Sequence, residues 1–362
     1  MSQRRVILLS LLALAGLVAL LQWAQREAPP SPGFLSEAAF AGLEERARAF
    51  PAPGTEPLRW PRDHGARSEQ FTESWLFAGR FLDEAGAPYA FQLAFLRVAV
   101  EAQAPERESA WGTRDVWRAR LVLEAADGDA FAEERFSRGA LELAGARQSG
   151  GAWVEDWYFE LDPQGDSFTL GASADGRALS LTLRAASHDP LGVSAEAYRG
   201  YWWPGLELSG TLAYDGQTRG VEGRAMLDRL WGRAQPAGRG QMALARLWFE
   251  SDDGTGLRCE QLRRRAGGGV PLTDCLHFPS GEASEATVEP AERGWTRIEG
   301  VRYPLQWTLV EPARDQSVAM APLVSVPATF ADGTLAASMR AGPRPDAGTG
   351  WGLVELTNFD SP

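Results

Sequence analysis

The stretch Gly-Val-Glu-Gly-Arg-Ala-Met-Leu-Asp-Arg-Leu-Trp-Gly, residues 220–232, decides the fold. It follows an alternating run, residues 206–214, and the turn pair Asp215-Gly216, which together are a strong signal for a β-hairpin. Side chains alternate between the two faces of a strand. The stretch therefore predicts a strand with Asp228 at its end, beside the large aromatic Trp231.

Runs of strand length, separated by turns rich in Asp, Gly and Pro, continue from residue 59 onward. Short strands at such spacing are typical of antiparallel barrels or sandwiches. One segment, residues 188–205, breaks this rhythm near the middle of the 362 residues. We therefore expect an all-β protein with domains over residues 34–198 and 199–362, each long enough for a closed barrel of about eight strands around one small ligand.

The opening stretch resembles the Gly-Xaa-Ala-Trp-Met-Asp-His-Glu-Trp signature of the carotenoid 1,2-hydratase (hydroxyneurosporene synthase) and AttH family. Three further segments follow in the family's order: Asp63-His64-Gly65 leading to residues 73–79, Phe91-Gln-Leu-Ala-Phe-Leu-Arg97, and residues 350–359. The resemblance implies two tandem lipocalin-like antiparallel β-barrels. The family's Glu-Trp-Trp-Tyr is Glu73-Ser74-Trp75-Leu76 here, and its Asp-His-Glu-Trp is Asp228-Arg229-Leu230-Trp231.

The reaction implied by the resemblance is hydration of an isoprenoid double bond. It needs a carboxylic acid to protonate the alkene, aromatic faces for the carbocation, and a placed water. Asp228 matches the family's aspartate and is the candidate acid, because burial in an apolar barrel favours a protonated carboxyl. The candidate ligand-binding residues are Glu73, Trp75, Trp202, Trp203 and Trp231.

Purely structural roles for these residues are alternatives. Arg229 stands where the family has histidine, which removes a proton carrier, and a neighbouring arginine favours an ionised aspartate. Asp228 can instead be a solvated strand-end carboxylate or part of a local salt bridge. Tryptophans in β-barrels usually fill the core. Glu73 can serve as a hydrogen-bonding group that closes the barrel.

The composition excludes several kinds of site. All 36 Lys and Arg residues are arginine, so a Schiff-base enzyme and a Walker-type phosphate loop are excluded. The three histidines, His64, His188 and His277, lie too far apart for a metal-ligand motif. A net charge of -12 disfavours nucleic acid as a partner. We therefore expect neither a metal nor an organic cofactor.

The N-terminus carries an export pattern. Arg4 and Arg5 precede an apolar run, residues 6–21, of a length between a signal-peptide core and a membrane span. Residues 1–33 are thus predicted to be a signal peptide or a retained anchor that contacts the membrane. The paired arginines keep the N-terminus cytoplasmic. We expect the remainder to lie in the periplasm of the bacterial cell envelope, either secreted or anchored to the inner membrane.

The two cysteines are placed for a disulfide. Cys259 and Cys275 flank residues 266–269, Ala-Gly-Gly-Gly, a turn signal that sets the cysteines opposite one another in a hairpin. Opposed strand residues lie within reach of a disulfide. The alternative is two free buried thiols.

Three functions remain open from the sequence. The preferred one is an envelope protein that binds a hydrophobic small molecule, an isoprenoid or a lipid, and has lost part of the catalytic set. The second is an active hydratase or cyclase without a metal, with Asp228 as its acid. The third is a structural or transporter-accessory protein, a partner of envelope transport components, whose barrels are filled and hold no ligand.

Overall fold

The computed structural model describes residues 45–102, 112–126, 128–185, 188–342 and 350–359. These residues belong to one compact unit, residues 37–362. Their regular structure is almost entirely β, with two short 3-10 helices, η1 (Arg62–His64) and η2 (Pro312–Arg314), and a few α-helical residues at 45–47. The predicted signal or anchor, residues 1–33, lies outside the described residues. Within the described part of the chain, no helix is long and apolar enough to cross a bilayer.

Among the described residues, the first sheet has twelve antiparallel strands and forms a nearly closed barrel. The strand order is β4-β3-β2-β1-β12-β11-β9-β8-β7-β6-β5, and β10 pairs with β11. The strands are β1 (Thr72–Asp83), β2 (Pro88–Ala99), β3 (Asp115–Ala125), β4 (Phe131–Arg138), β5 (Ala144–Ala146), β6 (Gly151–Val154), β7 (Trp157–Leu161), β8 (Ser167–Ala174), β9 (Arg177–Arg184), β10 (Leu191–Ser194), β11 (Tyr198–Tyr214) and β12 (Gln217–Gly232).

The second sheet has ten described strands and forms a half-barrel, in the order β16-β15-β14-β13-β24-β23-β21-β20-β17 with β22 beside β23. A separate hairpin pairs β18 with β19. The strands are β13 (Met242–Ser251), β14 (Gly256–Arg264), β15 (Leu272–Phe278), β16 (Ala283–Ser284), β17 (Thr287–Pro290), β18 (Trp295–Ile298), β19 (Val301–Pro304), β20 (Trp307–Glu311), β21 (Gln316–Pro322), β22 (Ala328–Thr329), β23 (Leu335–Gly342) and β24 (Gly350–Thr357).

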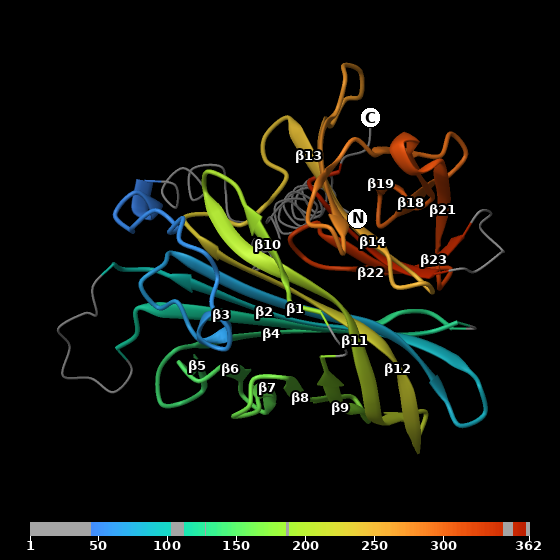
Figure 1. Cartoon of the computed structure of the whole chain (residues 1–362). Helices are drawn as coiled ribbons and strands as arrows, with labels where there is room; N and C mark the ends of the chain where they lie inside the picture. The colour runs from blue at the N-terminus through green and yellow to red at the C-terminus, as the bar shows by residue number, and fades with distance from the viewer. Residues whose placement is uncertain (1–44, 103–111, 127, 186–187, 343–349, 360–362) are drawn as a thin grey trace, which may run out of the picture. The chain divides into compact units, whose positions relative to one another are not determined.

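The change of sheet does not coincide with the expected boundary between residues 198 and 199. Strands β11 and β12 follow that boundary in the chain, yet β12 pairs along its length with β1, so both strands belong to the first barrel. Figure 1 shows β1 and β2 lying beside β11 and β12. The first sheet ends at Gly232 and the second begins at Met242.

The second half of strand β12, residues 225–232, is buried on both faces. Ala225, Leu227 and Trp231 face the interior of the first barrel and belong to its large aromatic core. Met226, on the other face, belongs to a separate cluster in which Trp248 of β13 takes part. The outer face of this half of β12 is therefore covered by the second sheet instead of by water.

The structure joins Cys259 and Cys275 by a disulfide, as predicted. The two residues are Cα partners on β14 and β15, and the turn between these strands uses positive φ angles at Gly267, Gly268 and Gly269. Glycine adopts such angles without a steric cost. The hairpin signal in the sequence thus specified the cysteine pairing.

Candidate functional site

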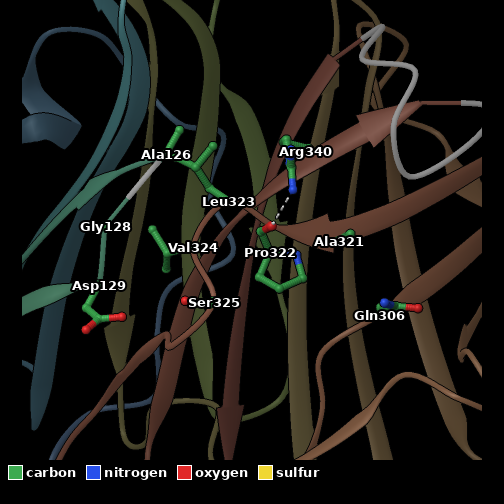
Figure 2. Close-up of a pocket in the computed structure, with 10 residues that line it drawn as sticks. All are labelled: Ala126, Gly128, Asp129, Gln306, Ala321, Pro322, Leu323, Val324, Ser325 and Arg340. Carbon is green, nitrogen blue, oxygen red and sulfur yellow. Dashed lines mark hydrogen bonds between the residues drawn. The ribbon is translucent and has the colours of Figure 1, made fainter.

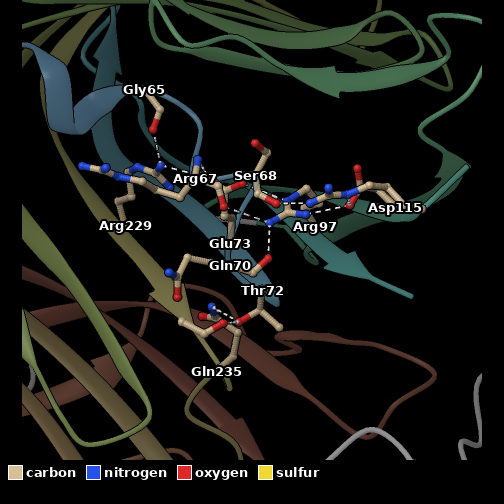
Figure 3. Close-up of polar contacts among 12 residues, drawn as sticks. Gly65, Arg67, Ser68, Gln70, Thr72, Glu73, Arg97, Asp115, Arg229 and Gln235 are labelled. Carbon is tan, nitrogen blue, oxygen red and sulfur yellow. Dashed lines mark hydrogen bonds and ion pairs between the residues drawn. The ribbon is translucent and has the colours of Figure 1, made fainter. Parts of the chain in front are cut away.

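One end of the first barrel's interior holds a buried polar network centred on Glu73 of β1 (Figure 3). Its Oε1 accepts a hydrogen bond from Nε of Arg97 at 2.8 Å, and its Oε2 accepts one from Nη2 of Arg229 at 3.0 Å. The backbone N–H of Arg67 also donates to Oε2, at 2.7 Å. Three donors therefore occupy the Glu73 carboxylate, and this residue positions Arg229 and Arg97.

Arg229 of β12 is fully buried between two of the predicted ligand-binding tryptophans. Its guanidinium carbon lies 4.3 Å from the ring centroid of Trp75 and 5.0 Å from that of Trp231. Its Nη2 also donates to the backbone oxygen of Gly65 at 2.6 Å. Among the described residues, its Nε and Nη1 atoms have no hydrogen-bond partner, and neither does Nε1 of Trp75. Several buried donors are thus available here.

A second group, around His64 of η1, adjoins this network. His64 Nδ1 lies 2.6 Å from the hydroxyl oxygen of Tyr201, and the two atoms share a hydrogen bond. The imidazole stacks on Trp60 at 4.7 Å and on Trp203 at 5.2 Å between ring centroids. Its Nε2 atom is buried and finds no partner in the part of the chain that the structure describes. The group therefore adds one more unpaired nitrogen to the aromatic interior.

His64 and Tyr201 are both neutral at neutral pH. Burial, and secondly the positive charge of Arg229, lower the pKa of His64 to about 4. Burial raises the pKa of the Tyr201 hydroxyl well above its usual range. A neutral imidazole beside a neutral phenol can either donate or accept a proton at Nε2, depending on its tautomer.

Asp228, the predicted acid, lies on the opposite face of β12, between the two sheets. It accepts hydrogen bonds from Arg246 at 2.7 Å, from Arg258 at 2.6 Å and from Nε1 of Trp248 at 3.0 Å. Burial alone would raise the pKa of Asp228, but the guanidinium groups of Arg258 and Arg246 outweigh it and hold the pKa below its usual range. Asp228 is thus an ionised carboxylate in a salt-bridge network, which is the alternative role that the sequence left open.

The structure brings together Glu73, Trp75, Trp203 and Trp231 in the first barrel, but not Trp202. Trp202 points outward from β11 and packs with Met226 and Phe278 between the sheets. It is adjacent to Trp203, and adjacent residues of a strand face opposite sides. The two tryptophans therefore cannot line one site.

Four residues central to the site were not among the predicted site residues: His64, Tyr201, Arg97 and Arg229. Tyr201 shares its strand face with Trp203, and Arg97 shares its face with Phe95, so alternation places both inside the barrel. Arg229 was noted only as the residue that replaces the family's histidine. The strand face that each residue shares with buried aromatic residues was therefore the sequence signal that could have identified Tyr201 and Arg97.

A separate cleft of about 560 Å³ opens elsewhere on the protein (Figure 2). It is lined by the loop after β3, by β21 and the segment that follows it, and by Arg340 of β23. None of the predicted site residues lines this cleft. No group of three or more possible metal-binding side chains occurs among the described residues.

The fold is lipocalin-like, with a nearly closed β-barrel and a half-barrel sheet among the described residues. A family model of AttH-like proteins matches residues 51–358, and the chain belongs to this family.

Two solved structures share the fold. An AttH protein from Nitrosomonas europaea is 20% identical with a TM-score of 0.71, and the match covers 86% of this chain and 99% of that one. Kievitone hydratase from Nectria haematococca is 11% identical with a TM-score of 0.60, covering 85% of this chain and 96% of that one. A search of curated proteins by sequence finds no match.

Proposed function

We propose that this protein is an exported lipocalin-like binding protein that holds a hydrophobic small molecule, an isoprenoid or a lipid, inside the first barrel. The observation that carries the proposal is the set of buried nitrogens of His64, Trp75 and Arg229 that find no partner among the described residues, in an aromatic interior. Binding sites for small molecules are mostly apolar, with a few placed polar groups. Such a composition suits a ligand with a long apolar body.

Entry of a ligand requires movement at the barrel end, because the interior side chains are closely packed. The segment from Leu58 to His64 is the element best placed to move. Its Trp60 and His64 side chains cover Trp203 and Tyr201, and η1 contributes only three residues of regular structure. Displacing these rings would leave Trp203 and Trp231 to line the ligand.

We also propose that the protein has lost the ability to protonate an alkene. The two carboxyl groups that match the family's acidic positions are Glu73 and Asp228. Three donors occupy Glu73, and Arg246 and Arg258 pair with Asp228. A carboxylate held in this way is a poor proton donor to an alkene. Binding without turnover is the expected outcome.

Export is supported by the apolar run after Arg4 and Arg5 and by the Cys259–Cys275 disulfide. Disulfides persist in oxidising compartments such as the periplasm. We therefore place the protein in the bacterial cell envelope, either secreted or held at the inner membrane by residues 1–33. Fractionation of cells, with detection of the mature N-terminus by mass spectrometry, tests both the compartment and the fate of this segment.

The function is tested by titrating the purified protein with acyclic isoprenoids while recording tryptophan fluorescence. The ligand is then extracted, and its mass is measured by mass spectrometry. Quenching with an unchanged ligand mass is expected. Trp75→Phe should weaken binding, whereas the matched variant Trp202→Phe, altered outside the barrel, should bind normally. A ligand that gains the mass of one water would establish a hydratase instead. Absence of binding would favour filled barrels with a structural role.

A second candidate function is the addition of water to a double bond conjugated with a carbonyl. The Nε2 atom of His64, which has no partner among the described residues, favours it, because in the tautomer protonated at Nδ1 this nitrogen can accept a proton from water. The water oxygen would bond to the β-carbon, the displaced electrons would move onto the carbonyl oxygen near Arg229, and the proton would return to the α-carbon. His64→Gln should abolish this turnover while leaving binding in place.

A further inference from the structure

Arg229 has no exposed surface, yet part of its guanidinium group has no hydrogen-bond partner among the described residues. Arginine is always protonated in proteins and has five N–H donors. Glu73 and Gly65 engage only Nη2. The Nε and Nη1 atoms are buried and without an acceptor among the described residues. A buried donor without a partner destabilises the folded state, and more strongly when it is charged.

The position of these donors is fixed before any ligand arrives. Residues Trp75 and Arg229 are Cα partners on β1 and β12, and the guanidinium lies against the Trp75 ring. Glu73 holds Nη2 from one side, and Trp231 contacts the guanidinium as well. The unpaired Nε1 of Trp75 belongs to the same stacked pair. Three donor atoms are therefore presented by one rigid unit.

We infer that the ligand of the first barrel carries a carbonyl or carboxylate oxygen, which accepts hydrogen bonds from Arg229 and Trp75, and that the barrel selects oxygenated isoprenoids over hydrocarbons. This inference rests on the proposed function. An acceptor oxygen would pair the donors, whereas a hydrocarbon would leave them unpaired. Sites built to hydrogen-bond a ligand reject analogues that lack the group by large factors. The stacked rings would contact the unsaturated part of the ligand.

The test uses four ligands with the same ten-carbon skeleton: geranic acid, geranial, geraniol and 2,6-dimethylocta-2,6-diene. Affinities for the purified full chain are measured by tryptophan quenching and by calorimetry. Geranic acid or geranial should bind at least tenfold more tightly than the hydrocarbon. The chain has no lysine, so geranial cannot form a lysine Schiff base that would confuse the comparison.

Arg229→Met should remove most of this preference while the hydrocarbon's affinity changes little. Trp75→Phe keeps a ring but loses one donor, and it should reduce the preference partly. Trp203→Phe is the matched control, because Nε1 of Trp203 already donates to the backbone oxygen of His188 at 2.9 Å. This variant should keep the preference. Circular dichroism checks that each variant is folded.

The outcomes distinguish a failure of this inference from a failure of the proposed function. If the wild-type protein binds all four ligands equally, the inference fails while the proposed function stands. If it binds none of them, the proposed function itself fails. A preference that persists in Arg229→Met would overturn the role of Arg229. Should Arg229→Met not fold, the four ligands with the wild-type protein and with Trp75→Phe still give the answer.

Discussion

Asp228 and Arg229 are consecutive in the chain, yet their side chains form ion pairs on opposite faces of the same strand. Asp228 accepts hydrogen bonds from Arg246 and Arg258 of the second sheet. Arg229 donates to Glu73 inside the first barrel. The two charges therefore do not neutralise each other. Asp228 links the two sheets, and Arg229 lies inside the first barrel.

The first prediction concerns Asp228. Asp228→Asn should lower the free energy of unfolding by roughly 3–5 kcal/mol, because it removes the shared partner of two buried arginines. Urea denaturation measures the effect. Glu355→Gln, which removes a more exposed partner of Arg246, is the matched control and should cost less than about 1 kcal/mol. An Asp228→Asn protein of wild-type stability would contradict the structural role.

A second prediction concerns Glu124 of β3, a buried residue whose carboxyl accepts the backbone N–H of Ser338 at 3.0 Å. Burial raises the pKa of Glu124 from 4.5 to about 7. The folded state then binds more protons than the unfolded state, so stability should fall as pH rises from about 4.5 to about 7, by roughly 3 kcal/mol. Unfolding curves at pH 5 and pH 8 measure the loss.

Glu124→Gln isolates this contribution, since the amide keeps the shape of the side chain and does not titrate. The difference in unfolding free energy between this variant and the wild type should grow in the variant's favour between pH 5 and pH 8. A difference that is constant with pH would show that Glu124 keeps an ordinary pKa in the folded state.

The third prediction concerns His64, whose contribution makes stability rise with pH instead of fall. Burial lowers its pKa from 6.5 to about 4, so the folded state binds fewer protons between these values, and stability should rise with pH across this interval. The ring protons of His64, assigned with His64→Gln, should not shift in NMR spectra between pH 5 and pH 8. A titration of His64 near pH 6.5 would refute the buried, neutral imidazole.

The fourth prediction concerns the disulfide. Thiol titration of the denatured protein should find no free thiol before reduction and two afterwards, since Cys259 and Cys275 are the only cysteines. The linked residues are 16 positions apart in sequence, and closing a loop of this length contributes about 3 kcal/mol in the chain-entropy account. Cys259→Ser with Cys275→Ser should lose about this much stability. A double variant as stable as the wild type would contradict the estimate.

Much of the fold was accessible from local patterns. The Asp215-Gly216 turn does join β11 to β12, and the cysteines face each other across β14 and β15. The domain boundary was harder to place. The irregular stretch near residue 198 resembles a linker, but β11 continues through it with a register shift between Trp203 and Leu206. A local break in the pattern did not mark the end of the barrel.

The candidate site was predicted only in part, and the reason is the two buried faces of β1, β11 and β12. Alternation alone groups Glu73 with Trp75, and it separates Trp202 from Trp203. It does not reveal which face encloses the barrel interior when the other face is also covered. Trp202 was therefore assigned to the ligand-binding residues and Asp228 was named as the candidate acid, although both lie between the sheets.

The sequence by itself determined the all-β class, the family, the hairpins and the disulfide, because these depend on neighbours along the chain. Only the tertiary structure decided that Arg246 and Arg258 pair with Asp228, and that Glu73, Arg229 and His64 share one barrel end. The physical reason is that a carboxyl's protonation and a donor's partners depend on charges brought close by strand pairing and sheet packing. Those neighbours come from distant parts of the chain.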